Sequence, residues 1–259
     1  MSRKIRLAAI SGNLSWDYRK TCSKETFDEA VAVRYIREYT DRMLALMEKA
    51  ARAGAQLVLS PEYFRGSEMF TTSEENRRKL IEPAGGPTTE RMRSLSREHG
   101  VALCATFDVD HGQHMHETAV MTGTDGAVVA VQPKHPRRVP APRDWPFNTG
   151  VRIYDLGFAS IGITICSDCT YDPELPLAMG RAGMEVLLLP GAGFSGMHVV
   201  RVRARDTQSV AVYADDGRAA IVDSEGEDIA ETGTREDVII ADAEILPKKC
   251  SPDYEPAPR

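Results

Sequence analysis

Short apolar runs alternate along the chain with longer segments in which apolar residues recur every three or four positions. The short runs are typical of buried strands, and the spaced segments are typical of amphipathic helices. Strand–helix–strand units and hairpins are mixed, which predicts mixed sheets with helices packed against them. The predicted strands are 5–10, 57–60, 101–107, 118–122, 128–132, 151–155, 159–166, 186–189, 210–213, 219–222 and 238–241.

Helix boundaries are indicated by capping and breaking residues. The longest predicted helix begins at a capping box, Thr26-Phe-Asp-Glu29, and ends at Gly54. Further helices are expected over about 88–99, from Asp172 to Gly183, and over 197–207. Two dipeptides of the Asp-Gly type lie between apolar runs, as hairpin turns do, at Asp125-Gly126 and Asp216-Gly217.

Composition narrows the class of protein. The 259 residues are 42% hydrophobic and 27% charged, which is typical of a globular protein with a sizeable core. Lys and Arg total 32 against 38 Asp and Glu, so the net charge of −6 disfavours binding to nucleic acid or to an anionic membrane. We expect residues 1–245 to form a single domain, and 246–259 to form a Pro-rich C-terminal tail.

The expected compartment follows from two further features. The short apolar run after the first basic residues is too short for a signal peptide, and no run reaches the roughly 20 apolar residues of a membrane span. The five cysteines form an odd set in a chain too long to need disulfide bonds for stability. We therefore expect a cytoplasmic protein with reduced thiols.

Cys166 stands out among the thiols. It ends the apolar run 159–166 just before a turn, and open α/β sheets bind ligands at the carboxyl ends of their strands. This position makes Cys166 a candidate nucleophile, although a small buried cysteine is the commoner role of a single thiol. Together with Cys169 it also forms a C-x-x-C pair, which could be redox-active or half of a zinc site. Without a second such pair we favour coincidence.

A base and a cation occupy similar positions. Glu62 follows a strongly apolar run and Pro61, and Lys134 follows another apolar run and Pro133. Either residue alone is more often an exposed surface group. Converging with Cys166 at one edge, however, the three would supply a base, a cation and a nucleophile.

At these motifs the sequence resembles the nitrilase, or carbon–nitrogen hydrolase, superfamily. The resemblance implies a four-layer αββα sandwich, with two mixed sheets and helices on the outer faces, that pairs as a homodimer or higher homo-oligomer. It implies Glu62 as general base, Lys134 as transition-state cation and Cys166 as nucleophile. The motifs are Leu59-Ser-Pro-Glu62-Tyr-Phe, Pro133-Lys134-His135, Gly162-Ile-Thr-Ile-Cys166-Ser-Asp168 and Gly183-Met-Glu-Val-Leu-Leu-Leu-Pro190.

One position departs from the family pattern. The family commonly has a second glutamate a few residues before the glycine that corresponds to Gly150, whereas this sequence has Arg143 with Asp144 beside it. Either Asp144 is a shifted second acid or that acid is absent. The loop after 210–213 is also shorter than in the family. Of the family's site residues, those that line the substrate pocket are therefore the least transferable to this sequence. Residues that could line the pocket are Tyr63, Trp145, Tyr171, Phe194 and His198.

The resemblance implies a hydrolase that cleaves a non-peptide C–N bond, in an amide or N-carbamoyl group of a small molecule. Cys166 would form a thioester, with Lys134 favouring the ionised thiol and the backbone N–H of Ser167 as a second oxyanion donor. The segment Cys166-Ser-Asp168 resembles the Cys-x-Asp pattern of the family's amidases more than the Cys-Trp-Glu of true nitrilases. The alternative is a degenerate hydrolase-like domain that serves as a binding or assembly subunit.

No cofactor is expected. The close spacing of His111, His114 and His116 permits a metal site, but we interpret this segment as a solvated hairpin tip. We therefore predict no metal ion among the functional groups.

Overall fold

The computed structural model describes residues 2–14, 23, 25–66, 72–112, 114–135, 150–193 and 196–247. Its first sheet has the strand order β13-β1-β2-β4-β5-β6, with the short β3 pairing to β4 outside this path. Strands β1, β2 and β4 run parallel, and the other neighbours on the path are antiparallel. The strands are β1 (Arg3–Ser11), β2 (Leu57–Leu59), β3 (Glu82–Pro83), β4 (Ala102–Asp110), β5 (Met115–Thr122), β6 (Val128–Pro133) and β13 (Asp237–Ile245).

The second sheet has the order β12-β11-β10-β9-β8-β7. Its central strands β8, β9 and β10 are parallel, and antiparallel strands complete both edges. Both sheets are therefore mixed, as the sequence predicts. The strands are β7 (Tyr154–Asp155), β8 (Ser160–Ile163), β9 (Val186–Pro190), β10 (Val210–Asp215), β11 (Arg218–Val222) and β12 (Asp228–Thr232).

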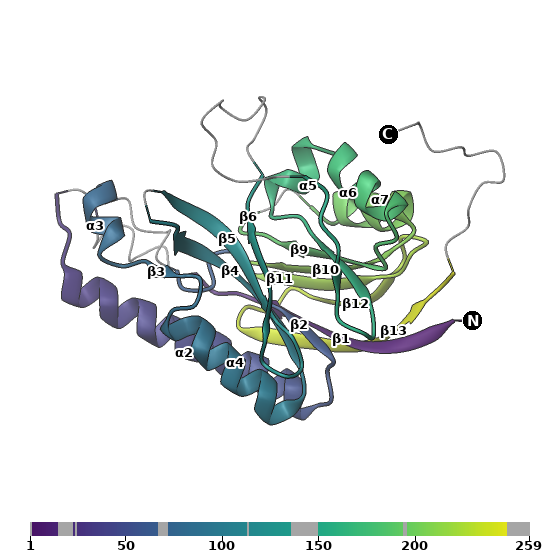
Figure 1. Cartoon of the computed structure of the whole chain (residues 1–259), viewed down its shortest axis with the longest axis horizontal. Coiled ribbons are helices and arrows are strands. Elements are labelled where there is room, and N and C mark those ends of the chain that lie inside the picture. Colours follow the sequence, from purple (N-terminus) through teal and green to yellow (C-terminus); the bar gives the residue numbers. More distant parts are fainter. Residues whose placement is uncertain are drawn as a thin grey trace.

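Helices cover the outer faces of the two sheets. Helices α2 and α4 lie on one side of the molecule, and α5, α6 and α7 lie on the other (Figure 1). No helix within the described ranges is long and apolar enough to cross a lipid bilayer. The helices are α2 (Glu29–Arg52), α3 (Glu74–Arg78), α4 (Pro87–His99), α5 (Ser167–Tyr171), α6 (Glu174–Arg181) and α7 (Met197–Thr207).

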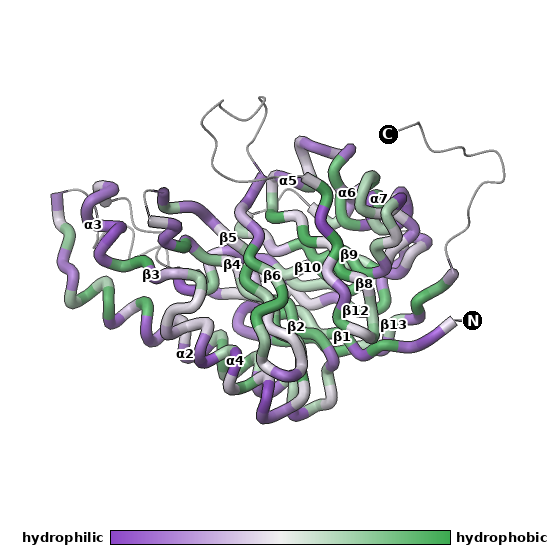
Figure 2. The backbone as a smooth tube through the Cα atoms, in the orientation of Figure 1, coloured by the Kyte–Doolittle hydropathy of each residue, from purple (hydrophilic) through white to green (hydrophobic). Residues whose placement is uncertain are grey.

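Alternation along the central strands explains the layers. On β9, Val186 and Leu188 pack between the two sheets, whereas Leu187 and Leu189 pack against the helices of the second sheet. Successive side chains of a strand point to opposite faces, so a strand covered on both sides is apolar throughout. Figure 2 shows these hydrophobic strands in the interior and more hydrophilic residues on the helices. The αββα architecture expected from the resemblance is confirmed.

The helices begin and end close to the predicted residues, except that α2 begins later than predicted. Helix α4 ends at Gly100, which has φ +64° and donates its N–H to Ser96. Helix α2 does not begin at the predicted Thr26 capping box: Asp28 is the N-cap and accepts from the N–H of Val31 at 3.1 Å. An aspartate closer to the apolar repeat satisfies the same free N–H groups.

Short elements account for the other differences. The sequence analysis missed β3, β12, α3 and α5, which have few residues and no full hydrophobic period. The predicted strand 159–166 ends at Ile163, and the predicted strand 151–155 is reduced to Tyr154–Asp155. The three residues after Ile163 lead into the turn at Cys166.

Candidate active site

Glu62 lies just beyond the carboxyl end of β2. The N–H of Ser60 still donates to the carbonyl of Cys104 on β4 at 3.0 Å, and Pro61 follows, which has no N–H to continue the ladder. The backbone N–H of Glu62 then donates to the carbonyl of Gly191 at 3.1 Å. The Glu62 residue is only 1% exposed, so its carboxylate is directed into the protein.

Lys134 directly follows β6. Its backbone N–H donates to the carbonyl of Glu117 on β5 at 2.8 Å, which extends the β5–β6 pairing by one residue. Its buried ammonium donates to the carboxylate of Glu62, and to Glu117 Oε2 at 2.7 Å. The sequence prediction that Glu62 and Lys134 share one edge therefore corresponds to a direct ion pair in the structure.

Cys166 sits at a strained turn between β8 and α5. Its φ is +49°, in a region that non-glycine residues rarely adopt, and helix α5 starts at the next residue, Ser167. Tyr63, next to Glu62, also has a positive φ, of 63°. Such conformations cost on the order of 1–3 kcal/mol and persist where the surrounding structure imposes them. Strain is thus concentrated next to two of the three predicted catalytic residues.

The segment Pro190–Ala192 at the end of β9 joins the base to the nucleophile. The carbonyl of Pro190 accepts from the backbone N–H of Cys166 at 2.7 Å, and the next carbonyl, of Gly191, holds Glu62. The backbone N–H of Ala192 faces the Cys166 sulfur and lowers the pKa of the thiol, against the larger effect of burial. Because one short segment contacts both residues, their separation is set by backbone hydrogen bonds rather than by side-chain packing.

The electrostatics of the site favour a protonated thiol at rest. Burial and the nearby Glu62 carboxylate raise the pKa of Cys166 to about 12, against a smaller lowering by Lys134. The sequence analysis expected Lys134 to favour the thiolate, but the cost of burying a charge outweighs its attraction. Burial also disfavours the Lys134 ammonium, yet Glu117 and Glu62 raise the pKa of Lys134 above its ordinary value. Lys134 is therefore a permanent cation beside a neutral thiol.

Glu117 is the acid that the sequence analysis missed. Its side chain is 12% exposed, on β5, and it contacts Lys134 from a different strand than Glu62 does. Asp144, the predicted candidate for a second acid, lies outside the described residues. One signal was present: counting back across the Asp125-Gly126 hairpin places Glu117 opposite Lys134.

Asp168 joins the residue after Lys134 to the residue before Cys166 by two hydrogen bonds. Its Oδ2 accepts from the backbone N–H of His135 at 3.1 Å and from that of Ile165 at 3.2 Å. Burial raises the pKa of Asp168 to about 7, against lowering by the hydrogen bond from His135. Asp168 therefore links the chain after Lys134 to the chain before Cys166.

The predicted hairpin tip lies between the end of β4 at Asp110 and the start of β5 at Met115, and His116 is not part of it. His116 belongs to β5, and its Nε2 lies 2.9 Å from the carbonyl oxygen of Lys134. Nε2 of His111 lies 2.9 Å from the hydroxyl of Thr118. Within the described ranges no group of three or more His, Cys, Asp or Glu residues is arranged to hold a metal ion.

The remaining predicted residues fall into two groups. Trp145 and Phe194 lie outside the described residues, as Asp144 does. Tyr171 ends α5 and is 53% exposed, and His198 lies in the first turn of α7. A part for any of them in substrate binding stays a prediction.

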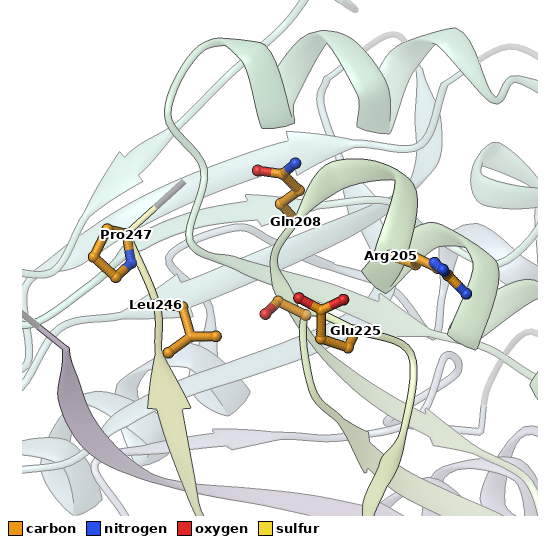
Figure 3. A pocket seen from close by; sticks show the side chains of 6 residues that line it. Arg205, Gln208, Glu225, Leu246 and Pro247 are labelled. Atoms are coloured by element: carbon orange, nitrogen blue, oxygen red, sulfur yellow. The ribbon is translucent and has the colours of Figure 1, made fainter. Parts of the chain in front are cut away.

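A separate surface hollow of about 180 Å³ opens beside the end of α7 (Figure 3). It contains none of the predicted site residues. Its lining consists of Arg205, Gln208, Ser224, Glu225, Leu246 and Pro247.

An αββα sandwich with Glu62, Lys134 and Cys166 at the adjoining strand ends defines a protein of the nitrilase-fold class. A family model described as carbon-nitrogen hydrolase matches residues 35–245, and the chain belongs to this family.

Individual relatives agree with this assignment. The chain is 26% identical over 238 residues to the omega-amidase NIT2 of Xenopus tropicalis, covering 80% of this chain and 83% of the relative. It is 30% identical over 145 residues to a nitrilase of Pyrococcus abyssi, covering 56% of this chain and about half, 55%, of that protein. The crystal structure of Saccharomyces cerevisiae Nit3, a member of branch 10 of the nitrilase superfamily, has a TM-score of 0.71 at 20% identity, covering 95% of this chain and 91% of Nit3.

Proposed function

We propose that the chain hydrolyses a non-peptide C–N bond, in an amide or N-carbamoyl group of a small molecule, through a thioester on Cys166. The main support is the contact between the Cys166 thiol and Glu62, with the Lys134 ammonium bound to the same carboxylate. A buried base beside a neutral thiol suits a nucleophile that loses its proton only as it attacks. Membership of the carbon-nitrogen hydrolase family adds to this support.

In the first step the thiol proton passes to Glu62 as sulfur forms a bond to the carbonyl carbon. The carbonyl oxygen becomes an oxyanion, which the Lys134 ammonium stabilises together with the backbone N–H of Ser167. Lys134 is suited to this task because its ammonium is already held in place by two carboxyl groups and needs no reorganisation. One such oxyanion donor is typically worth about 3–4 kcal/mol of the barrier.

Collapse of the tetrahedral intermediate breaks the C–N bond. Glu62 returns its proton to the leaving nitrogen, so ammonia or an amine departs and a thioester remains on Cys166. Glu62 then takes a proton from water, the resulting hydroxide attacks the thioester, and Glu62 returns that proton to sulfur as the C–S bond breaks and the acid leaves. One residue thus alternates between base and acid, which requires a carboxylate held within reach of sulfur and of the substrate.

An amide is preferred to a nitrile as substrate. The sequence Cys166-Ser-Asp168 resembles the amidase pattern, and in this structure Asp168 binds backbone N–H groups at the turn rather than facing outward. The similarity to the omega-amidase of Xenopus tropicalis supports this preference, whereas the relative from Pyrococcus abyssi is a nitrilase. Nitrile hydrolysis is therefore the second outcome that a substrate screen should include.

The test is a screen of primary amides, N-carbamoyl amines and nitriles, with ammonia release as the measurement. Wild type should turn over at least one amide or N-carbamoyl compound, and Cys166→Ala should abolish that turnover. Cys169→Ala is the matched control, because Cys169 is a buried thiol three residues away that takes no part in the scheme. Mass spectrometry of rapidly quenched wild type should show the acyl group on Cys166.

Two results would contradict the proposal. Full turnover by Cys166→Ala would exclude the thioester route. No turnover of any compound by folded wild type would favour the alternative, a binding or assembly subunit.

We also propose an oligomeric state and a cellular compartment for the protein. The family resemblance leads us to expect a homodimer or larger homo-oligomer, which light scattering of the purified chain tests directly. We expect the protein to act in the cytoplasm, where its thiols stay reduced. Localisation of a tagged full-length chain in cells tests that expectation.

A further inference from the structure

The proposed mechanism leaves one buried carboxyl group without a task. Glu117 Oε2 accepts from Lys134 at 2.7 Å, but Glu117 Oε1 is buried without a hydrogen-bond partner among the described residues. An unpaired polar oxygen is costly to bury, so its presence in this site calls for a physical reason.

The neighbouring carboxyl group of Glu62 explains how the unpaired oxygen of Glu117 can be satisfied. It lies within hydrogen-bonding reach of Glu117 and contacts the same Lys134 ammonium. Two ionised carboxylates only accept, so they cannot bond to each other; a single proton between them gives the pair a donor. One proton on the pair would therefore satisfy the orphaned oxygen.

Counting charges leads to the same result. With both carboxylates ionised, the Lys134 ammonium positive and the Cys166 thiol neutral, the buried group carries one net negative charge. With one proton on the pair, its net charge is zero. The side chains of Glu62, Lys134 and Glu117 are nearly inaccessible to water, and burying an unbalanced charge is costly, so the neutral arrangement is favoured.

The proton belongs on Glu117 rather than Glu62. The Glu62 carboxylate accepts from Lys134 and lies beside the Cys166 thiol, whose pKa it raises, whereas Lys134 is the only donor to Glu117 among the described residues. The carboxylate with more donors is the one favoured in its ionised form. Burial and the neighbouring Glu62 raise the pKa of Glu117 well above its ordinary value, which agrees with this assignment.

The charged and titratable groups around Glu117 come from β4, β5, the end of β6 and the start of α5. Lys134 at the end of β6 is the only cation within bonding distance of Glu117 among the described residues, and it is shared with Glu62. On β4, Asp108 is the cross-strand partner of Glu117 but is paired with Arg77 of α3. The other titratable groups that face the cluster are Asp168 of α5 and Cys166, together with His116 on β5 itself.

We propose that Glu117 is a positioning residue that holds a proton in the resting site, shares it with Glu62, and so keeps the Glu62–Lys134–Glu117 cluster neutral before the thiol reacts. Glu62 then remains ionised and able to accept the thiol proton. The positive charge of Lys134 is balanced by one carboxylate only, so its ammonium can stabilise the oxyanion. If Glu117 lost its proton, the added negative charge would oppose the oxyanion. The catalytic part of this inference rests on the proposed function; the protonation itself does not.

A substrate-free test follows from linkage. The folded chain retains a proton on Glu117 that the unfolded chain releases above about pH 4–5, so this group's stabilisation of wild type is lost as pH rises through its folded pKa. Glu117→Gln keeps the shape, stays neutral and lacks this loss. Between about pH 5 and about pH 8 the unfolding temperature of Glu117→Gln should rise relative to wild type by roughly 3 °C or more.

The control is Glu74→Gln in α3, whose side chain is 68% exposed and pairs with the guanidinium of Arg78, so its offset from wild type should stay constant with pH. A difference between Glu117→Gln and wild type that is flat, or that falls as pH rises, would overturn the proposal, because a Glu117 that is ionised in both the folded and the unfolded chain contributes no such rise over this range. Infrared spectra of wild type provide a second test that does not require the variant to fold. Wild type grown with [¹³C]glutamate should show the ¹³C-shifted band of a protonated glutamate carboxyl group near neutral pH. Its absence would equally overturn the proposal.

The catalytic consequence is tested on a substrate from the amide screen. The alkaline fall of kcat/KM should move to higher pH in Glu117→Gln by about one unit or more, because the variant has no group to ionise beside Lys134. An unmoved alkaline limb, with the expected stability slope, would leave Glu117 protonated but refute its part in catalysis. If no substrate is found at all, the proposed function fails while the stability and infrared results still decide the protonation.

Discussion

The carboxylate of Asp168 accepts a hydrogen bond of 3.1 Å from the backbone N–H of His135. The same oxygen accepts from Ile165 at 3.2 Å, so the residue after Lys134 is fixed to the residue before Cys166. Lys134 and Cys166 are carried by different sheets. One buried side chain therefore sets the position of the cation relative to the nucleophile.

Asp168→Ala should weaken both folding and catalysis. It leaves two buried N–H groups without an acceptor, at about 1–3 kcal/mol each, so urea unfolding should show a loss of a few kcal/mol. Turnover of the amide substrate should fall by more than tenfold, because Lys134 and Cys166 lose their shared anchor. Asp168→Asn, which keeps one acceptor oxygen, should fall between wild type and Asp168→Ala; equal activity in all three would contradict this role.

Asp168 also predicts a pH dependence of stability. Its pKa is raised to about 7 in the folded chain, so the folded state holds a proton that the unfolded chain releases from about pH 4 upward. The stabilisation is complete below about pH 4, is lost as pH rises, and is gone above about pH 7; its upper bound is about 4 kcal/mol. Asp168→Asn should lack this slope, as measured by urea unfolding at a series of pH values. An unchanged slope in the variant would contradict the assignment.

Most of the fold could be predicted because its signals are local. Helix α7 covers the predicted 197–207, and the strands of both sheets follow from apolar runs such as Val186–Pro190. A turn after Cys166 was predicted, but the left-handed conformation of Cys166 and the end of β8 at Ile163 could not be, because the apolar run continues through Ile165 and the positive φ is imposed by contacts with β9. Apolar composition identifies burial but does not locate the end of a strand.

The candidate site was predictable where residue type and strand end coincide, as at Glu62 and Lys134. Glu117 was not, because it lies within a strand and becomes important only through the pairing of β5 with β6. Its contact with Lys134 depends on register, which the hairpin geometry sets and which the order of motifs along the chain does not show. The role of Asp168 likewise depends on two backbone N–H groups from separate segments.

Glu62→Gln should make the thiol more reactive and the protein less active. Burial, then Glu62, raises the pKa of Cys166 to about 12, so removing the negative charge should lower that pKa. Near pH 8.5 the iodoacetamide rate at Cys166 should rise about tenfold for each unit by which the pKa falls. Ammonia release should drop by about 10²–10⁴-fold, because the general base is lost.

In Glu62→Gln the alkylation of Cys166 is expected to rise while ammonia release falls, so the control must identify which thiol reacts. A variant that only loosened the site would expose Cys104 and Cys169 as well as Cys166, so peptide mapping of the alkylated sites is the control. A fall in both alkylation and turnover would contradict the assignment of Glu62 as the group that holds the thiol proton in place.

Asp215 should control the donor that faces the Cys166 sulfur. Its Oδ1 accepts from the N–H groups of Gly193 and Asp216 at 2.6 Å each, and its other oxygen accepts from the Tyr213 hydroxyl. Asp215→Ala should release the segment that carries Ala192 and lower turnover by about tenfold to a hundredfold. Tyr213→Phe keeps the acceptor for Gly193, so its turnover should fall much less; an equal fall in both variants would assign the effect to the hydroxyl instead.

Gly162 on β8 tests how closely the strand before Cys166 packs against α6. A Cβ at this position would lie 2.2 Å from Sδ of Met184 and 3.0 Å from Sδ of Met179. Gly162→Ala should therefore cost about 1–3 kcal/mol of unfolding free energy from overpacking, as measured by urea unfolding. Gly233→Ala is the matched control, because a Cβ there meets nothing within 4 Å and should change stability little.

A double-mutant cycle identifies the cause of that loss. Met184→Ala alone should destabilise the protein by leaving a cavity, at about 2–5 kcal/mol. In Gly162→Ala/Met184→Ala the new methyl group enters the space that the methionine vacates, so the combined loss should be smaller than the sum of the two single losses. Additive losses would mean that the methyl group disturbs the backbone of β8 rather than Met184, and the steric explanation would then be wrong.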